Sequence, residues 1–458
     1  MRFYLLVALA NLLMTASAVF AAVAIEATVD SQPIPERVKD LKLSQPPNAK
    51  AWKEKILLDN GRLAVDGPGG RIVIDFGARR KYVIDSKAAT YSEWSLYSDP
   101  GFRVYEIINR AHLARVLEAA RLDKPQKEAV NTHTEIAFAE HELSIAHPQT
   151  PGKPEVVTLA TAAEFNVGKL TIFRISREGT PLSNRDAGAL ARYFRYFKGG
   201  HPAALAALEA QRNVPVEVVM TSGPFQAVRL TLRLRVIPSD QAPRASLDGL
   251  RKAAPSGLRG VPDDIAKLAF RITGESDATI AQRLQATYQQ AEASFALGNV
   301  VAGFLTALEY NLQKGGMASE LLASHRAAIM NAPQLSSVLP AVDQAKTKEE
   351  AERAIASLQK ARADAGDKAY VLGIFEANHQ RALGRLNDAR ALFVAALRAN
   401  PYITGVWKDL GDLAFGQIEP AAAWVCWDTG RRIAPQFENF QQVNDFEQRL
   451  VREHPEYF

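Results

Sequence analysis

Cysteine is nearly absent from this chain of 458 residues, where Cys426 is the only one. A single thiol cannot form an intramolecular disulfide, which excludes a small fold held together by disulfides. No cysteine stands close to the N-terminal apolar segment either, so the attachment point of a bacterial lipoprotein is missing. Because Cys426 lies between Trp424 and Trp427, we expect it to be a small core residue of a helix.

The sequence also lacks the short motifs of common catalytic sites. Gly-x-Ser-x-Gly, His-Glu-x-x-His and Asp-x-Asp do not occur. The run from Gly67 to Gly70 leads into a strand and has no Lys-Ser/Thr ending, so it predicts a turn and not a phosphate loop. We therefore expect no catalytic residue and no cofactor.

Histidine is scarce, and three of the eight histidines fall in one stretch among glutamates: His133, His141 and His147, with Glu135, Glu140 and Glu142. Zinc accepts both residue types, so a hydrolase or another metal-dependent enzyme is one interpretation. The spacing matches neither a helical histidine pair nor a known short motif. We favour exposed or structural residues and predict no metal site.

An excess of charge of one sign is missing as well. The net charge of +5 is small for this length and does not favour nucleic acid as a partner. One local exception is an expected strand at 228–236, where apolar residues alternate with Arg229, Arg233 and Arg235. These arginines predict either a cationic face for an anionic lipid or glycan, or an ordinary solvated face of a sheet.

Long hydrophobic runs are absent except at the N-terminus, where residues 3–24 read FYLLVALANLLMTASAVFAAVA. This segment predicts a secretory signal peptide, cleaved after Ala24 or after Ala18 at an A-x-A-like site. An uncleaved membrane anchor is the alternative. We expect cleavage, and hence a periplasmic or secreted protein with a signal peptide at 1–24. Residues 25–50 contain four prolines and predict an extended lead-in.

Residues 51–237 contain mostly strand patterns. Asn60-Gly61 is a strong signal for a two-residue hairpin loop, and the run at 67–70 predicts a second turn. The strands that follow read RIVIDF, KYVID and TYSEWSL, which predicts an antiparallel meander. We also expect helices at 102–121, from Ser183 to about Phe197 and from Pro202, strands at 133–145 and 155–176, and a hairpin that ends in strand 228–236.

The succession of the strand sequences VIDF, KYVID and TYSEWSL resembles the sheets of periplasmic lipoprotein-carrier-like folds. Those folds are half-open barrels that hold an apolar ligand. The resemblance implies an α+β domain with a curved antiparallel sheet, and a ligand cavity between the apolar faces of strands 71–76 and 228–236.

A proline-rich segment at 238–265 predicts a linker, and residues 266–458 are helical. The expected helices cover 277–297, 299–314, 317–331 and 348–365, the last with the capping box Thr347-x-x-Glu350. A final amphipathic helix at 436–452 predicts the polar-faced cap of a helical stack.

Two stretches near the C-terminus carry one pattern at an offset of 34 residues. The first copy, at 370–403, contains Gly373, Glu376, Ala377, Gln380, Ala389, Phe393, Ala396 and Pro401. The second copy, at 404–437, contains Trp407, Leu410, Gly411, Ala414, Ala423, Trp427, Gly430 and Pro435. The period and the small, large and proline positions resemble the tetratricopeptide repeat, a two-helix unit that stacks on copies of itself.

The resemblance implies an all-α solenoid that binds a peptide or a protein on the concave side formed by the first helix of each repeat. The residues at the matching positions are Asn378, Arg381, Lys408, Asp412 and Phe415. A mixed polar and aromatic lining suits an extended segment, whose backbone needs hydrogen-bond partners. The alternative is that these are ordinary exposed residues of helices.

The sequence therefore favours a non-catalytic adaptor in the bacterial envelope that binds an unknown envelope protein or peptide. The alternative is a periplasmic carrier or chaperone that shelters a lipid or lipoprotein in the N-terminal sheet.

Overall fold

The structure is a computed structural model that describes residues 22–35, 48–59, 61–100, 155–167, 170–222, 228–315, 320–417 and 419–458. It divides into two compact units at Arg251/Lys252, inside the predicted linker. We name residues up to 91 and 155–251 the sheet unit, and residues 92–100 and 252–456 the helical unit. Residues 92–100 were predicted in the sheet domain. The helix expected at 102–121, the strands expected at 133–145 and the histidine stretch lie outside the described residues.

The sheet unit is built on an antiparallel-rich sheet with the strand order β14-β6-β5-β4-β3-β2-β1-β13-β12-β9-β8-β7, in which β6 and β14 begin in the sheet unit and end in residues assigned to the helical unit. Its strands are β1 Val23–Pro33, β2 Lys50–Asp59, β3 Arg62–Gly67, β4 Gly70–Asp75, β5 Arg80–Asp85, β6 Thr90–Ser95, β7 Glu155–Thr158, β8 Ala162–Val167, β9 Leu170–Ser176, β12 Glu217–Ser222, β13 Val228–Ile237 and β14 Arg251–Lys252. A separate pair consists of β10 Gly179–Pro181 and β11 Asn213–Pro215.

The predicted meander is confirmed, including both of its tight turns. Asp59 of β2 pairs with Arg62 of β3, which leaves a two-residue loop, and Gly61 adopts a φ of 76°. Gly67 pairs with Gly70 across the second turn, where Gly70 has a φ of 95°. Glycine adopts these left-handed conformations without a steric penalty, so the turns set the register of the strands that follow.

The segment predicted as an extended lead-in contains β1, a central strand of the sheet. β1 pairs with β2 on one side and with β13 on the other. The lead-in prediction was wrong because the prolines lie at the end of the strand and beyond it, while VAIEATVD carries the alternation of a strand. Of the two candidate cleavage sites, the one after Ala24 falls inside β1, where Ala24 is 1% exposed and pairs with Leu57 and Ile237.

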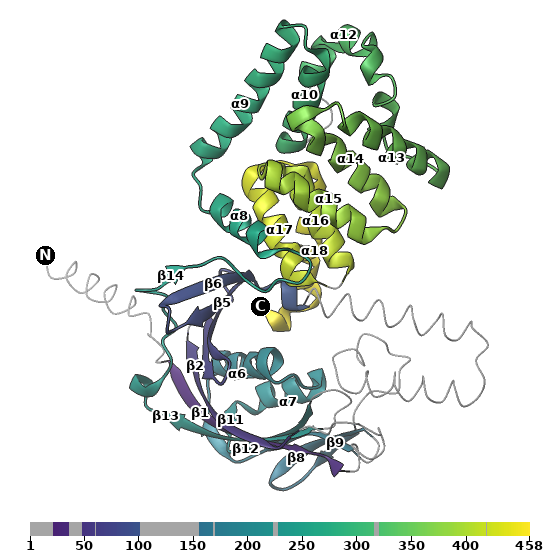
Figure 1. Cartoon of the computed structure of the whole chain (residues 1–458). Helices are drawn as coiled ribbons and strands as arrows, with labels where there is room; N and C mark the ends of the chain where they lie inside the picture. The colour runs from purple at the N-terminus through teal and green to yellow at the C-terminus, as the bar shows by residue number, and fades with distance from the viewer. Residues whose placement is uncertain are drawn as a thin grey trace, which may run out of the picture. The chain divides into compact units, whose positions relative to one another are not determined.

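One face of the sheet is covered by two helices, α6 Asn184–Phe197 and α7 Pro202–Gln211. Both begin as predicted, since Ser183 caps α6 through the Asp186 amide and Pro202 opens α7. Figure 1 shows the sheet curving around these helices. Phe173 of β9 contacts Phe194 of α6, with ring centroids 6.1 Å apart. The chain's own helices therefore occupy this concave side.

The opposite face is covered in part by the proline-rich segment. Ala242, Ala245, Leu247 and Leu250 pack against an apolar cluster that includes Ala24, Val73 and Ile84. The first part of the predicted linker is thus bound to the sheet.

The helical unit contains the helices α8 Asp263–Thr273, α9 Asp277–Ala296, α10 Val300–Lys314, α11 Glu320–Ser324, α12 Arg326–Met330, α13 Lys348–Arg362, α14 Ala369–Ala382, α15 Leu386–Ala399, α16 Thr404–Gly416, α17 Pro420–Ile433 and α18 Gln441–Glu453. The capping box of α13 is present as predicted. Three expectations need correction: the helix at 317–331 is two short helices, the final helix begins at Gln441, and α8 was missed. None of the helices in the described ranges is long and apolar enough to cross a bilayer.

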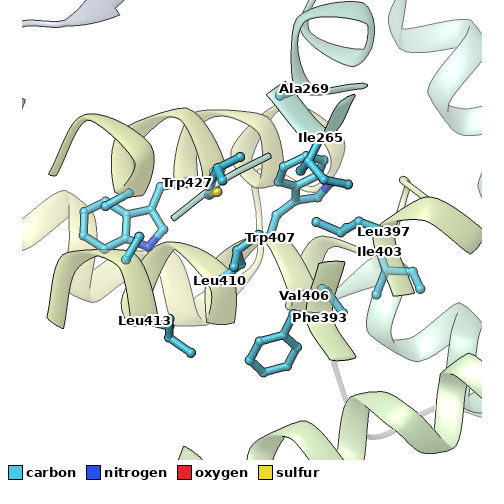
Figure 2. Packing of buried hydrophobic residues seen from close by; sticks show 14 of the residues in the cluster. Ile265, Ala269, Phe393, Leu397, Ile403, Val406, Trp407, Leu410, Leu413 and Trp427 are labelled. Carbon is cyan, nitrogen blue, oxygen red and sulfur yellow. The ribbon is translucent and has the colours of Figure 1, made fainter. Parts of the chain in front are cut away.

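The two sequence copies form two helical hairpins, α14–α15 and α16–α17. Their second helices begin at Leu386 and Pro420 and end at Ala399 and Ile433, an offset of 34 residues at both ends. Trp407 and Trp427 lie in the core, and Figure 2 shows Ile265 and Ala269 of α8 in the same cluster. The missed helix α8 therefore completes the core of the hairpins by packing against α15 and α17.

The glycines of the second copy lie where a neighbouring aromatic ring packs closely against the helix. A Cβ atom on Gly411 would lie 2.5 Å from the ring of Trp427, and one on Gly430 would lie 2.5 Å from Phe440. The first hairpin has Ala377 and the smaller ring of Phe393 at the positions that correspond to Gly411 and Trp427. Large and small side chains are thus matched within each hairpin.

Candidate ligand groove

A groove of about 760 Å³ opens in the helical unit. It is lined by α10, α14 and α16, and by the loops at 342–345 and 437–439. The lining residues are Asn311, Leu312, Gly315, Val342, Asp343, Gln344, Ala345, Phe375, Asn378, His379, Arg381, Ala382, Gly405, Lys408, Asp409, Phe437, Glu438 and Asn439. We call this surface the inner groove.

The walls of the inner groove follow from the helical hairpins. α14 and α16 are the first helices of the two hairpins, and α10 packs against both. Glu309 of α10 is 2% exposed and forms an ion pair with Lys368 at 2.6 Å, and Asn400 donates a second hydrogen bond to it. These contacts fix α10 against the two ends of the first hairpin, because an ion pair at this depth is costly to break.

Three of the five predicted partner-binding residues lie in the inner groove: Asn378, Arg381 and Lys408. Asp412 is not among the lining residues, and its carboxylate accepts hydrogen bonds from Lys408 Nζ and Trp427 Nε1. Phe415 is placed differently from the prediction. It packs against Trp424, Trp427 and Phe446 and is not among the lining residues.

Both cations of the inner groove are paired with carboxylates. Arg381 Nη1 lies 3.0 Å from Asp409 Oδ1, and Lys408 Nζ lies 2.6 Å from Asp412 Oδ2. Burial raises the pKa of Asp409, and the nearby Arg381 opposes this effect. The floor of the groove is therefore close to neutral in charge and rich in polar atoms.

Four carboxamide side chains line the inner groove: Asn311, Gln344, Asn378 and Asn439. The Oδ1 atom of Asn378 is buried and has no hydrogen-bond partner among the residues that the structure describes. A buried acceptor without a partner costs about 1–3 kcal/mol, so native proteins seldom leave one unpaired. A carboxamide offers one acceptor and two donors, which complement the N–H and C=O groups of a polypeptide backbone.

His379 has a different role from Asn378. Its Nε2 atom lies 2.8 Å from the carbonyl oxygen of Ala341. Because a carbonyl oxygen can only accept, Nε2 carries the proton and donates to it. His379 is 5% exposed and ties α14 to the segment that leads into the loop at 342–345. Its contribution is to hold that wall of the groove.

The sequence did not identify the contributions of α10 and of the two loops. Asn311 and Leu312 lie in a stretch where the repeat pattern is degenerate, and the loops at 342–345 and 437–439 carry no motif. Only the 34-residue period pointed to this surface, and it locates just α14 and α16.

Other sites considered from the sequence have less support. Arg235 binds Glu26 through Nε at 3.0 Å and Nη2 at 2.8 Å, and this contact lowers the pKa of Glu26. Arg233 lies 3.7 Å from Glu217, so two of the three arginines predicted as a cationic face are paired with acids. Among the described residues, no group of three or more His, Cys, Asp or Glu residues is placed to hold a metal ion.

No family model matches the chain, and neither a curated protein nor a solved structure matches it. Its function is therefore inferred from the groove and from the repeat pattern.

Proposed function

We propose that this chain is an exported, non-catalytic adaptor whose helical unit is a tetratricopeptide-type solenoid. The inner groove binds an extended segment of a partner protein of the bacterial envelope. Asn378, Arg381 and Lys408 contact that segment directly. Asp412 acts behind them by holding Lys408 in position.

The observation that carries this proposal is the buried Oδ1 atom of Asn378, which has no hydrogen-bond partner in the described part of the chain. An N–H group from an extended backbone would satisfy it, and the exposed carboxamides of Gln344 and Asn439 offer further donors and acceptors. Phe375 and Leu312 add apolar contact area between these polar groups. A backbone that enters this groove exchanges its hydrogen bonds to water for hydrogen bonds to the protein.

The carrier alternative is less favoured because α6 and α7 cover the concave side of the sheet. Glu54 of β2 is 6% exposed and accepts hydrogen bonds from Tyr193 of α6 at 2.6 Å and from Lys198 at the end of α6. A ligand that entered between β2 and α6 would have to break this buried network, which is expensive in a medium of low dielectric constant.

Selection of a random-peptide library on the full chain tests the proposal. The expected result is a set of peptides that the wild-type chain retains and that the variant Asn378→Ala loses. Asn387→Ala is the matched control, because Asn387 is exposed on α15 and is not a lining residue of the groove. Peptides that bind all three chains equally, or no retained peptide at all, would contradict the proposal.

A further inference from the structure

We infer that the inner groove selects a partner segment that carries cationic side chains. This inference rests on the proposed function and specifies the chemistry of its ligand. It follows from the positions of the charged residues in the groove and from which of them are already paired.

The two cations of the groove are neutralised within the protein. Arg381 is paired with Asp409, and Lys408 is paired with Asp412 on the same helix. An acidic segment would have to compete with these carboxylates for Arg381 and Lys408. Breaking either pair would leave Asp409 or Asp412 without its partner, so an acidic ligand is disfavoured.

Two carboxylates of the groove are left over. Asp343 follows the short helix Leu339–Ala341, and Glu438 opens the short helix Glu438–Phe440. Both side chains belong to exposed residues, and within the described part of the chain neither takes part in an ion pair. They come from different loops that line the groove, one from the loop at 342–345 and the other from the loop at 437–439.

The exposed rim of the groove, at Asp343 and Glu438, therefore carries negative charge. The floor, where Arg381 and Lys408 are paired with carboxylates, is nearly neutral. A segment with Lys or Arg side chains near its two ends would place them beside Asp343 and Glu438 while its backbone meets the carboxamides. Such rim charges raise the association rate and discriminate between partners more than they add raw affinity. Their effect should weaken as salt is raised, because exposed charges are screened.

The test is the same peptide selection on the full chain, now scored for composition. The expected result is enrichment of Lys and Arg over Asp and Glu among the peptides that are lost on Asn378→Ala. One enriched peptide is then titrated against Asp343→Asn/Glu438→Gln. We expect its affinity to fall by about 2- to 30-fold, the range for losing two exposed ion pairs.

The matched control is Glu349→Gln/Asp388→Asn. Both residues are exposed and lie outside the groove, and the double change alters the net charge of the chain by the same amount. An equal loss of affinity in the control would overturn the inference, because long-range attraction would then explain it. Groove-dependent peptides that are neutral or acidic would overturn the inference and leave the proposed function standing. A library with no groove-dependent peptide would overturn both.

Discussion

Gly411→Ala is expected to destabilise the helical unit, although alanine is the better helix former. The new Cβ would lie 2.5 Å from Cδ1 and Nε1 of Trp427. The indole cannot easily move aside. Its ring centroid lies 5.0 Å from that of Trp424, and its Nε1 donates a hydrogen bond to Asp412 Oδ1 at 3.1 Å. Overpacking costs about 1–3 kcal/mol, and replacing Gly in a helix returns about 1 kcal/mol. The net loss of unfolding free energy is therefore at most about 2 kcal/mol.

Trp427→Phe should relieve this clash, because it reproduces the Ala377 and Phe393 combination of the first hairpin. The two changes should therefore couple favourably, by about 0.5–3 kcal/mol in a double-mutant cycle. Guanidinium unfolding followed by tryptophan fluorescence measures all four chains, and far-UV circular dichroism checks that the transitions coincide. The packing argument would be refuted if Gly411→Ala were at least as stable as the wild type and showed no coupling to Trp427→Phe.

Three further predictions concern other parts of the helical unit. Glu309→Ala should cost about 3–5 kcal/mol in chemical unfolding, because it leaves the charge of Lys368 unpaired; a loss below 1 kcal/mol would contradict the anchoring of α10. Burial raises the pKa of the Cys426 thiol, so a thiol reagent should modify it only after unfolding, and rapid labelling of the native chain would be inconsistent with this. The hydrogen bond from Arg398 lowers the pKa of Asp264. The stabilisation by this hydrogen bond should be present above about pH 4 and vanish as the pH falls through the lowered pKa of Asp264. The difference in Tm between the wild type and Asp264→Asn should therefore shrink in acid. A difference that stays constant with pH would argue against the Arg398–Asp264 pair.

The parts of the fold that local patterns specify were predictable from the sequence. The hairpin at Asn60-Gly61, the cap at Ser183 and the capping box at Thr347 each depend on a few neighbouring residues, and the structure has all three. The hairpins α14–α15 and α16–α17 were predictable for a related reason. Their period places small and large residues at fixed positions that close packing requires.

Elements whose role depends on distant partners were harder to predict. β1 was hidden because its partner β13 lies some 200 residues away in the sequence. α8 follows a proline-rich stretch, and its place against α15 and α17 depends on contacts that no local pattern encodes. The inner groove was predicted only along α14 and α16, since α10 and the two loops reach it through tertiary packing.

The same dependence explains the misplacement of Phe415. The repeat pattern assigns its position to the concave side, but the side chain packs with Trp424, Trp427 and Phe446 instead. A large aromatic ring gains more from burial in that cluster than from exposure to a groove. The period specifies the face of a helix, and the neighbouring side chains decide where a side chain on that face packs.

The most direct measurement for the inner groove compares stability and binding in one variant, Asn378→Ala. If Oδ1 of Asn378 serves a ligand, its removal should leave the unfolding free energy of the free chain unchanged or higher, because an unpaired buried acceptor is lost. The same change should lower the affinity of a selected peptide by about 5- to 30-fold, as measured by isothermal titration calorimetry. This is the effect of losing one or two backbone hydrogen bonds. Lower stability with unchanged affinity would mean that Asn378 is structural and that the groove does not bind the segment as proposed.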